Sequence, residues 1–132
     1  MKEPIWIETR EALAIHERLL VIHGGAPGLL DRNVLDSALA RPKQHFADAE
    51  SADILSLAAI YTASIVQRHP FVDGNKRAGF VLGVLFLELN GYRFRATQED
   101  AARAVLDLGA GTTSELDYAR FLRANSGETG IR

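Results

Sequence analysis

Apolar residues recur at helical spacing along almost the whole chain, and no stretch alternates long enough to build a sheet. The expected helices cover residues 9–22, 31–40, 53–68, 76–89, 97–108 and 114–125. Two of these segments, 53–68 and 76–89, are apolar on most faces, as is typical of helices buried in a core. The pattern therefore predicts one all-α domain, residues 1–132, in which a polar loop joins two buried central helices.

Capping and turn residues predict where the helices begin and end. Thr9 and Ser114 are placed to cap the first and last helices, and Thr97 with Asp100 resembles a capping box. The sequence Asn90-Gly91 gives the second buried helix a C-terminal stop.

The connections between helices are expected to be irregular. Pro42 follows the second helix closely, so residues 42–50 are expected to form a loop, with an extended piece around 44–46. Residues 92–95 are expected to be briefly extended, and the tail, residues 126–132, to be frayed.

Composition excludes several classes of protein. The 132 residues carry 17 acidic side chains against 15 Lys and Arg, a net charge of −2, which argues against direct nucleic-acid binding. The absence of cysteine excludes disulfides, thiolate metal sites and a cysteine nucleophile. No segment approaches the roughly 20 apolar residues of a membrane span. The start, Met1-Lys2-Glu3-Pro4, is unlike a signal peptide, so a cytoplasmic protein is expected.

The polar loop and the start of the next helix, residues 69–77, concentrate groups that do chemistry. His69 can give or take a proton near neutral pH. Asp73 supplies a hard oxygen ligand of the kind that Mg²⁺ prefers. The residues that follow suit a phosphate site at a helix N-terminus: Gly74, Asn75, Lys76 and Arg77.

Each of these residues has a structural explanation when taken alone. A histidine at a helix end is commonly a polar cap, Gly-Asn is common in turns, and Lys-Arg is common at surfaces. Their density in one loop between apolar helices supports a phosphate site as well as it supports a set of unrelated surface residues, and both interpretations stay open on these residues alone.

The run His69-Pro-Phe-x-Asp-Gly-Asn-Lys-Arg77 resembles the motif of the Fic/Doc family, in its death-on-curing (Doc) variant. The similarity extends over most of the chain, roughly residues 10 to 120. Its further segments are His16-Glu17-Arg18-Leu19, Gly24 to Gly28, Leu35 to Pro42, and Phe86 to Gly91.

Two positions distinguish this chain from the adenylyltransferases of that family. Those enzymes carry a second glycine where this chain has Lys76, and an arginine where it has Phe80. Both differences are typical of Doc-type toxins, in which the nucleotide presents its γ-phosphate to the target hydroxyl. The resemblance therefore implies protein phosphorylation rather than AMP transfer, with the translation elongation factor of the Tu type as the target.

The resemblance also implies roles for the loop residues. His69 would deprotonate a Ser or Thr hydroxyl of the target, and Asp73 would hold Mg²⁺ against the phosphates of the co-substrate ATP. Gly74, Asn75, Lys76 and Arg77 would bind those phosphates, with Asn75 adding its side-chain amide. Phe71 is expected to hold the loop on the core.

The chain lacks the Ser/Thr-x-x-x-Glu-Gly/Asn segment with which many Fic proteins block their own site. Within the family this absence implies a separate cognate antitoxin as partner. Three alternatives remain: an adenylyltransferase of the same fold, a ribonuclease using Arg41 with His45, and a catalytically silent binding module.

Three other polar residues fit structural roles better than catalytic ones. Arg68 lies at a helix C-terminus, where a cation is stabilising. His16 and His23 lie seven residues apart without carboxylates or cysteines beside them, so packing at the surface or against a loop is expected.

Overall fold

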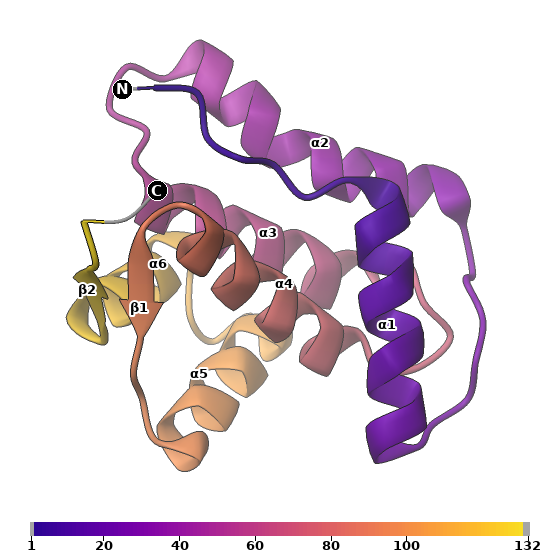
Figure 1. Cartoon of the computed structure of the whole chain (residues 1–132). Helices are drawn as coiled ribbons and strands as arrows, with labels where there is room; N and C mark the ends of the chain where they lie inside the picture. The colour runs from indigo at the N-terminus through magenta and orange to yellow at the C-terminus, as the bar shows by residue number, and fades with distance from the viewer. Residues whose placement is uncertain (1, 131–132) are drawn as a thin grey trace.

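The structure is a computed structural model that describes residues 2–130, and it confirms an all-α fold (Figure 1). Its elements are α1 (Thr9–His23), α2 (Arg32–Asp48), α3 (Ile54–Arg68), α4 (Asn75–Leu89), β1 (Tyr92–Phe94), α5 (Gln98–Ala110), α6 (Glu115–Ala124) and β2 (Ser126–Glu128). Helix α3 lies at the centre and packs against α2, α4, α5 and α6. Every residue from 57 to 66 is buried, which explains why this helix is apolar on most faces.

Helices α3 and α4 pack closely because two glycines of α4 face α3. A Cβ at Gly79 would lie 2.8 Å from Cγ1 of Val66, and a Cβ at Gly83 would clash with the hydroxyl of Thr62. The Thr62 hydroxyl also donates a hydrogen bond of 2.8 Å to the carbonyl of Gly79. The two helices that carry the polar loop therefore form one rigid unit.

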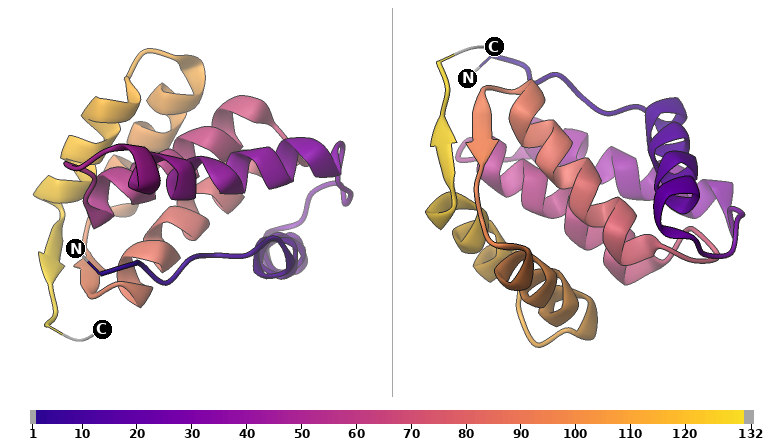
Figure 2. Two further views of the ribbon diagram at one scale, coloured as in Figure 1. Left: turned by 90° about the horizontal axis from the view of Figure 1, so that it is seen from above. Right: turned by 60° about the horizontal axis from the view of Figure 1, so that its bottom comes forward.

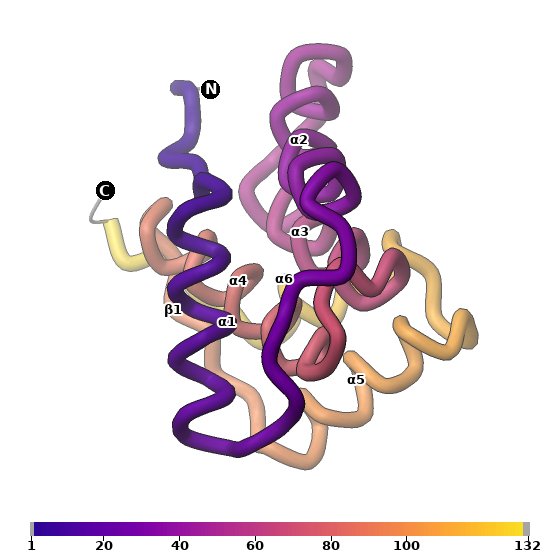
Figure 3. The backbone as a smooth tube through the Cα atoms, turned by 90° about the vertical axis from the view of Figure 1, so that its right-hand side faces the viewer, coloured from indigo at the N-terminus to yellow at the C-terminus, as the bar shows by residue number. Residues whose placement is uncertain are grey.

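The remaining elements surround this pair. Helix α1 packs against α4, while β1 and β2 form an antiparallel ribbon at the opposite end of the molecule (Figure 2). Figure 3 views the molecule from the side that carries α1 and the segment leading from it to α2. No helix within residues 2–130 is long and apolar enough to cross a membrane.

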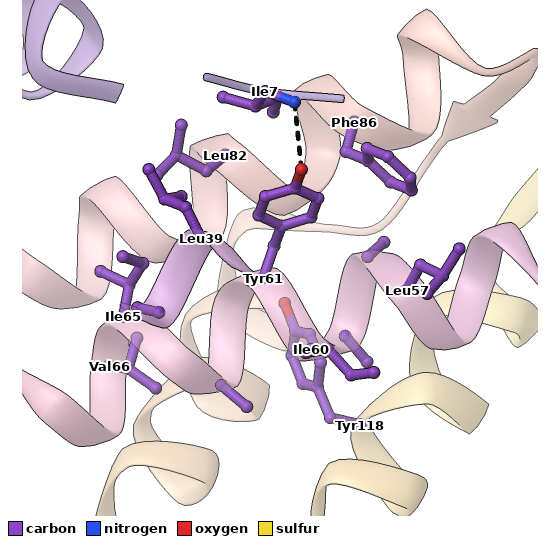
Figure 4. Packing of buried hydrophobic residues seen from close by; sticks show 14 of the residues in the cluster. Ile7, Leu39, Leu57, Ile60, Tyr61, Ile65, Val66, Leu82, Phe86 and Tyr118 are labelled. Carbon is purple, nitrogen blue, oxygen red and sulfur yellow. Dashed lines mark hydrogen bonds between the residues drawn. The ribbon is translucent and has the colours of Figure 1, made fainter. Parts of the chain in front are cut away.

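The core is anchored by Tyr61 of α3, whose ring packs against Phe86 of α4 (Figure 4). The Tyr61 oxygen accepts a hydrogen bond of 3.0 Å from the amide of Ile7. Burial raises the pKa of Tyr61 to about 12, so the phenol stays neutral. This contact fixes the N-terminal segment over the two central helices and so sets where α1 begins.

The expected loop at residues 42–50 is wrong, because α2 continues through Pro42 to Asp48. Proline costs the helix one backbone hydrogen bond, but Pro42 is buried against the rest of the protein. Arg41, just before it, donates hydrogen bonds to Ser64 and Glu115, which holds this turn against α3 and α6. Tertiary packing thus outweighs the local effect of the proline.

Two further predictions are corrected. Thr9 does not cap α1: the N-cap is Glu8, whose amide donates to the Glu11 side chain, while the Thr9 hydroxyl bonds Asp36. The tail is not frayed over 126–128, because these residues pair with β1 as β2. Residues 131 and 132 of that prediction lie outside the described residues. The other helices and the extended segment at 92–94 agree with the sequence analysis.

Candidate active site

The polar loop begins where α3 ends, at His69. This residue has a left-handed backbone, φ 53°, and its amide donates to the carbonyl of Ile65. A non-glycine residue in this conformation is uncommon and is held there by its surroundings. The result is a sharp turn that leaves the imidazole exposed.

Phe71 attaches the loop to the core, as expected, and is almost fully buried. Its amide donates to Oδ1 of Asn75 at 3.0 Å, and Nδ2 of Asn75 donates back to its carbonyl at 2.9 Å. The side-chain amide of Asn75, expected to face phosphates, is therefore buried and bound to the loop backbone. Only the main chain of Asn75 is left for a ligand at the helix N-terminus.

A second segment, residues 24–30, supports the loop from the other side. The carbonyl of Pro70 accepts the amide of Leu30 at 2.7 Å, and the amide of Val72 donates to the carbonyl of Gly28 at 3.0 Å. These bonds tie the loop to the chain between α1 and α2, 40 or so residues earlier in sequence. The loop is thus held from two directions before any ligand binds.

The carboxylate of Asp73 is exposed but held in place by main-chain donors. It accepts hydrogen bonds from the amide of Ala26 at 3.1 Å and from the amide of Gly74 at 2.8 Å. These two donors, with smaller effects of Arg77 and His16, hold the pKa of Asp73 below its usual value. The carboxylate is therefore ionised at neutral pH and fixed in direction, as an oxygen ligand of a metal ion needs to be.

Gly25 allows this arrangement. Its φ is +121°, a value that side chains disfavour, and a Cβ there would lie 2.9 Å from Oδ2 of Asp73. Any larger residue at position 25 must push the carboxylate or the loop aside.

Helix α4 begins at Asn75, and its N-cap, Gly74, has no side chain to cap it. The first-turn amides, those of Asn75, Lys76 and Arg77, accordingly have no capping acceptor among the described residues. Free amides at a helix N-terminus, with the helix dipole behind them, attract anions. The start of α4 therefore has the chemistry of a phosphate site.

The residues singled out from the sequence share one pocket of about 340 Å³. Its lining consists of His69, Val72, Asp73, Gly74, Asn75, Lys76 and Arg77. The side chains of Lys76 and Arg77 are exposed and form no ion pair with another described residue. The pocket thus combines an imidazole, a carboxylate, two cations and the start of a helix.

The donor set suits a divalent cation that arrives with a nucleotide. Nowhere in residues 2–130 do three histidine or carboxylate side chains gather as a complete metal site. Mg²⁺ is commonly bound by one or two carboxylates together with substrate phosphates and water. The single carboxylate of Asp73 beside a phosphate-type site fits that pattern.

His16 is the site residue whose importance the sequence analysis missed. It is 5% exposed, its ring stacks on Phe71 at 3.7 Å between centroids, and its Nε2 lies 2.8 Å from the carbonyl oxygen of Asp73. Packing against a loop was expected for it, and the structure confirms that much. The contact between His16 and Asp73 joins residues 57 positions apart, so no local sequence pattern reveals it.

The remaining polar residues lie outside the pocket. Arg68 donates to the hydroxyl of Ser37, which agrees with the structural role expected for it. Arg41 is paired with Glu115, and His45 is exposed four residues along α2. Arg41 is thus engaged with Glu115 and does not line the pocket that contains His69.

The sequence model of the Fic/DOC family matches residues 6–87, more than half of the chain, including the loop, all of α3 and most of α4. The chain belongs to the Fic/Doc family. It is 30% identical over 106 residues to "Protein kinase doc" of Escherichia phage P1, covering 80% of this chain and 82% of that protein. It is also 30% identical over 99 residues to "Toxin Doc" of Mycolicibacterium smegmatis, covering 74% and 76%. The resemblance stated from the sequence is therefore confirmed.

Proposed function

We propose that this Fic/Doc protein is a Doc-type toxin, a cytoplasmic protein kinase that uses ATP and Mg²⁺. Its target is a Ser or Thr hydroxyl of a translation elongation factor of the Tu type, and its modification blocks translation. The observation that carries this proposal is the convergence of His69, Asp73 and the uncapped start of α4 on one pocket. The relative named a protein kinase supports this reaction, and the relative named Toxin Doc supports the role as a toxin.

In the proposed reaction the target oxygen forms a bond to the γ-phosphorus of ATP as the bond from that phosphorus to the β,γ-bridging oxygen breaks. His69 takes the hydroxyl proton, and ADP leaves with the electron pair of the broken bond. Positioning and charge stabilisation dominate the rate of such transfers. Lys76, Arg77 and the first amides of α4 would stabilise the phosphate oxygens.

Mg²⁺, when bound with the nucleotide, would neutralise phosphate charge, and Asp73 is the residue that would hold it. The two main-chain hydrogen bonds to this carboxylate keep it ionised and fixed in direction. Those bonds leave further lone pairs of the carboxylate available, since an ionised carboxylate accepts about four hydrogen bonds or metal contacts.

Phosphate transfer is favoured over AMP transfer by two side chains. Lys76, in the position of a family glycine, lines the pocket and adds bulk and charge beside the loop. Phe80, in the position of a family arginine, instead packs edge-to-face on Phe94 of β1, with ring centroids 5.8 Å apart. Position 80 of α4 therefore supplies no arginine to contact phosphates.

A protein partner at this end of the molecule is supported by exposed apolar side chains. Val72 and Leu30 are 47% and 64% exposed beside the pocket, and Val21 and Ile22 are exposed at the end of α1. Exposed apolar residues gathered beside a site are typical of protein interaction surfaces. We propose that the target and a cognate antitoxin both bind here.

Intact-mass spectrometry of the purified elongation factor tests the proposal. The factor is incubated with this protein, ATP and Mg²⁺, with His69→Asn as the control variant. A mass gain of one phosphate that the variant abolishes is expected. A gain of AMP would replace the kinase with the adenylyltransferase alternative. An unchanged mass, with no ATP binding to this protein in a parallel titration, would favour the silent binding module.

A further inference from the structure

His16 lies behind the proposed active site and does not line its pocket. Its ring is buried between α1 and the loop, stacked nearly parallel on Phe71 with an interplanar angle of 7°. Its Nε2 lies within hydrogen-bond distance of the Asp73 carbonyl oxygen. Because a carbonyl oxygen only accepts, the proton of a neutral ring must be on Nε2 for this bond to form. The ring therefore makes two separate contacts, one through its face and one through its donor.

We propose that His16 is a positioning residue for the phosphate transfer, acting through its Nε2–H bond to the Asp73 carbonyl. The inference rests on the proposed function for its catalytic consequence. Its structural part concerns the peptide between Asp73 and Gly74, the one that directs the exposed carboxylate.

The direction of that peptide follows from its planarity. The C=O and N–H of a trans peptide point in opposite directions, and residues 2–130 contain no cis peptide bond. With its carbonyl held inward by His16, the peptide turns the Gly74 amide outward, where it donates to Oδ1 of Asp73 at 2.8 Å. The Ala26 amide holds Oδ2 from the other side. One buried donor thus fixes the direction of a carboxylate it does not touch.

The same peptide links His16 to the start of α4. Gly74 is the N-cap of α4, and a Cβ on it would lie 3.6 Å from Nε2 of His16. A shift of this peptide would therefore move both the carboxylate and the first amides of α4. Small displacements of positioned groups cost large factors in rate.

Ring packing alone is the simpler explanation, and two substitutions distinguish it from the donor bond. His16→Phe keeps an aromatic face for Phe71 and removes the donor. His16→Gln places an amide donor near the position of Nε2 and removes the ring. If the donor is what matters, the Gln variant retains function and the Phe variant loses it.

The first arm measures amide exchange with water by NMR in the metal-free protein, and needs no activity. In His16→Phe the Asp73 carbonyl loses its donor, so the Gly74 amide is no longer held toward Oδ1 of Asp73. This amide should then exchange about tenfold faster, the factor expected for one lost hydrogen bond. The Phe71 amide should stay within about twofold of wild type, since its bond to Asn75 is untouched. The amide of Ile60 in α3 reports global unfolding in both variants. An unchanged Gly74 amide in the Phe variant would overturn the proposal.

The second arm measures phosphate transfer to the elongation factor. In His16→Phe we expect kcat to fall about 10²-fold, with KM for the factor nearly unchanged, and His16→Gln should recover most of the loss. Equal losses in both variants, or a loss confined to KM, would show that His16 is only a packing residue. If wild type transfers no phosphate, the proposed function fails, while the first arm still decides how His16 directs the loop.

Discussion

The N-termini of the two central helices, α3 and α4, are built in opposite ways. At α3 the Asp53 side chain accepts the amide of Ser56 at 2.9 Å and is paired with Arg123 at 2.7 Å. At α4 the N-cap is Gly74, and no side chain in residues 2–130 caps the first turn. The first arrangement satisfies the helix end within the protein, whereas the second leaves the first-turn amides without a side-chain acceptor in the part of the chain that the structure describes.

The other helices make the contrast sharper. Side chains of Asp31, Thr97 and Ser114 cap α2, α5 and α6. A capped end stabilises the fold, while an uncapped end beside two exposed cations attracts phosphate. We expect substitutions at the start of α3 to change stability, and substitutions around the start of α4 to change activity.

The largest effect is expected at His69. Replacement by Asn removes the base but suits the left-handed backbone, because Asn is enriched at positive φ. Phosphate transfer should fall about 10²–10⁴-fold, the usual contribution of positioned proton transfer, with the melting temperature nearly unchanged. Single-turnover labelling of the elongation factor measures this loss. Wild-type rates in the variant would remove His69 from the mechanism.

The next largest effect is expected at Gly25. Alanine there would place Cβ 2.9 Å from Oδ2 of Asp73, and the displaced carboxylate should lower phosphate transfer about 10²-fold. Gly24→Ala is the matched control, because Gly24 also has positive φ but nothing within 4 Å of its Cβ. Both variants place an alanine at positive φ, so equal activities would contradict the role given to this contact.

At the start of α3 the expected effect is on stability alone. Asp53→Ala removes the cap of α3 and should lower the free energy of unfolding by about 0.5–2 kcal/mol, as measured by urea denaturation. The exposed pair with Arg123 adds little to this value. Turnover of the variant should match wild type. A large loss of turnover would contradict the claim that the start of α3 affects stability and only the start of α4 affects activity.

The smallest expected effect is the pH dependence of the stability that the Asp53 cap gives to the fold. Partial burial alone would raise the pKa of Asp53, but hydrogen bonds from Ser56 and the charge of Arg123 lower it below its usual 3.8. The carboxylate therefore stabilises the fold above that pH, and the stabilisation is lost as pH falls through the lowered value.

Unfolding of wild type and Asp53→Asn, compared from about pH 5 to about pH 2.5, measures this effect. The stability difference between the two proteins should shrink as pH falls, since a protonated Asp resembles Asn. A difference that stays constant with pH would show that the charge of Asp53 does not contribute.

The sequence predicted what local physics determines. The central helices could be recognised because they are apolar on most faces, and residues 69–77 because their chemistry is concentrated between them. Long-range contacts could not be recognised. The continuation of α2 through Pro42 depends on Arg41 reaching α3 and α6, and the short β1–β2 ribbon depends on pairing across more than 30 residues.

In the candidate site, too, the sequence predicts local features but not long-range contacts. The pocket-lining residues could be predicted because they are contiguous in sequence, but their support comes from the distant segment 24–30 and from His16. The side chain of Asn75 was assigned to phosphate from its position in the motif, and only the fold shows that it bonds Phe71.

The most direct test of the account is an NMR titration of the protein with ATP and Mg²⁺. The amides of Asn75, Lys76 and Arg77, at the uncapped start of α4, should shift strongly, while those of the capped first turn of α3 should not move. Shifts confined to another surface, such as the pocket lined by Arg93 and Arg95 beside the β-ribbon, would contradict the assignment of the start of α4 as the phosphate site.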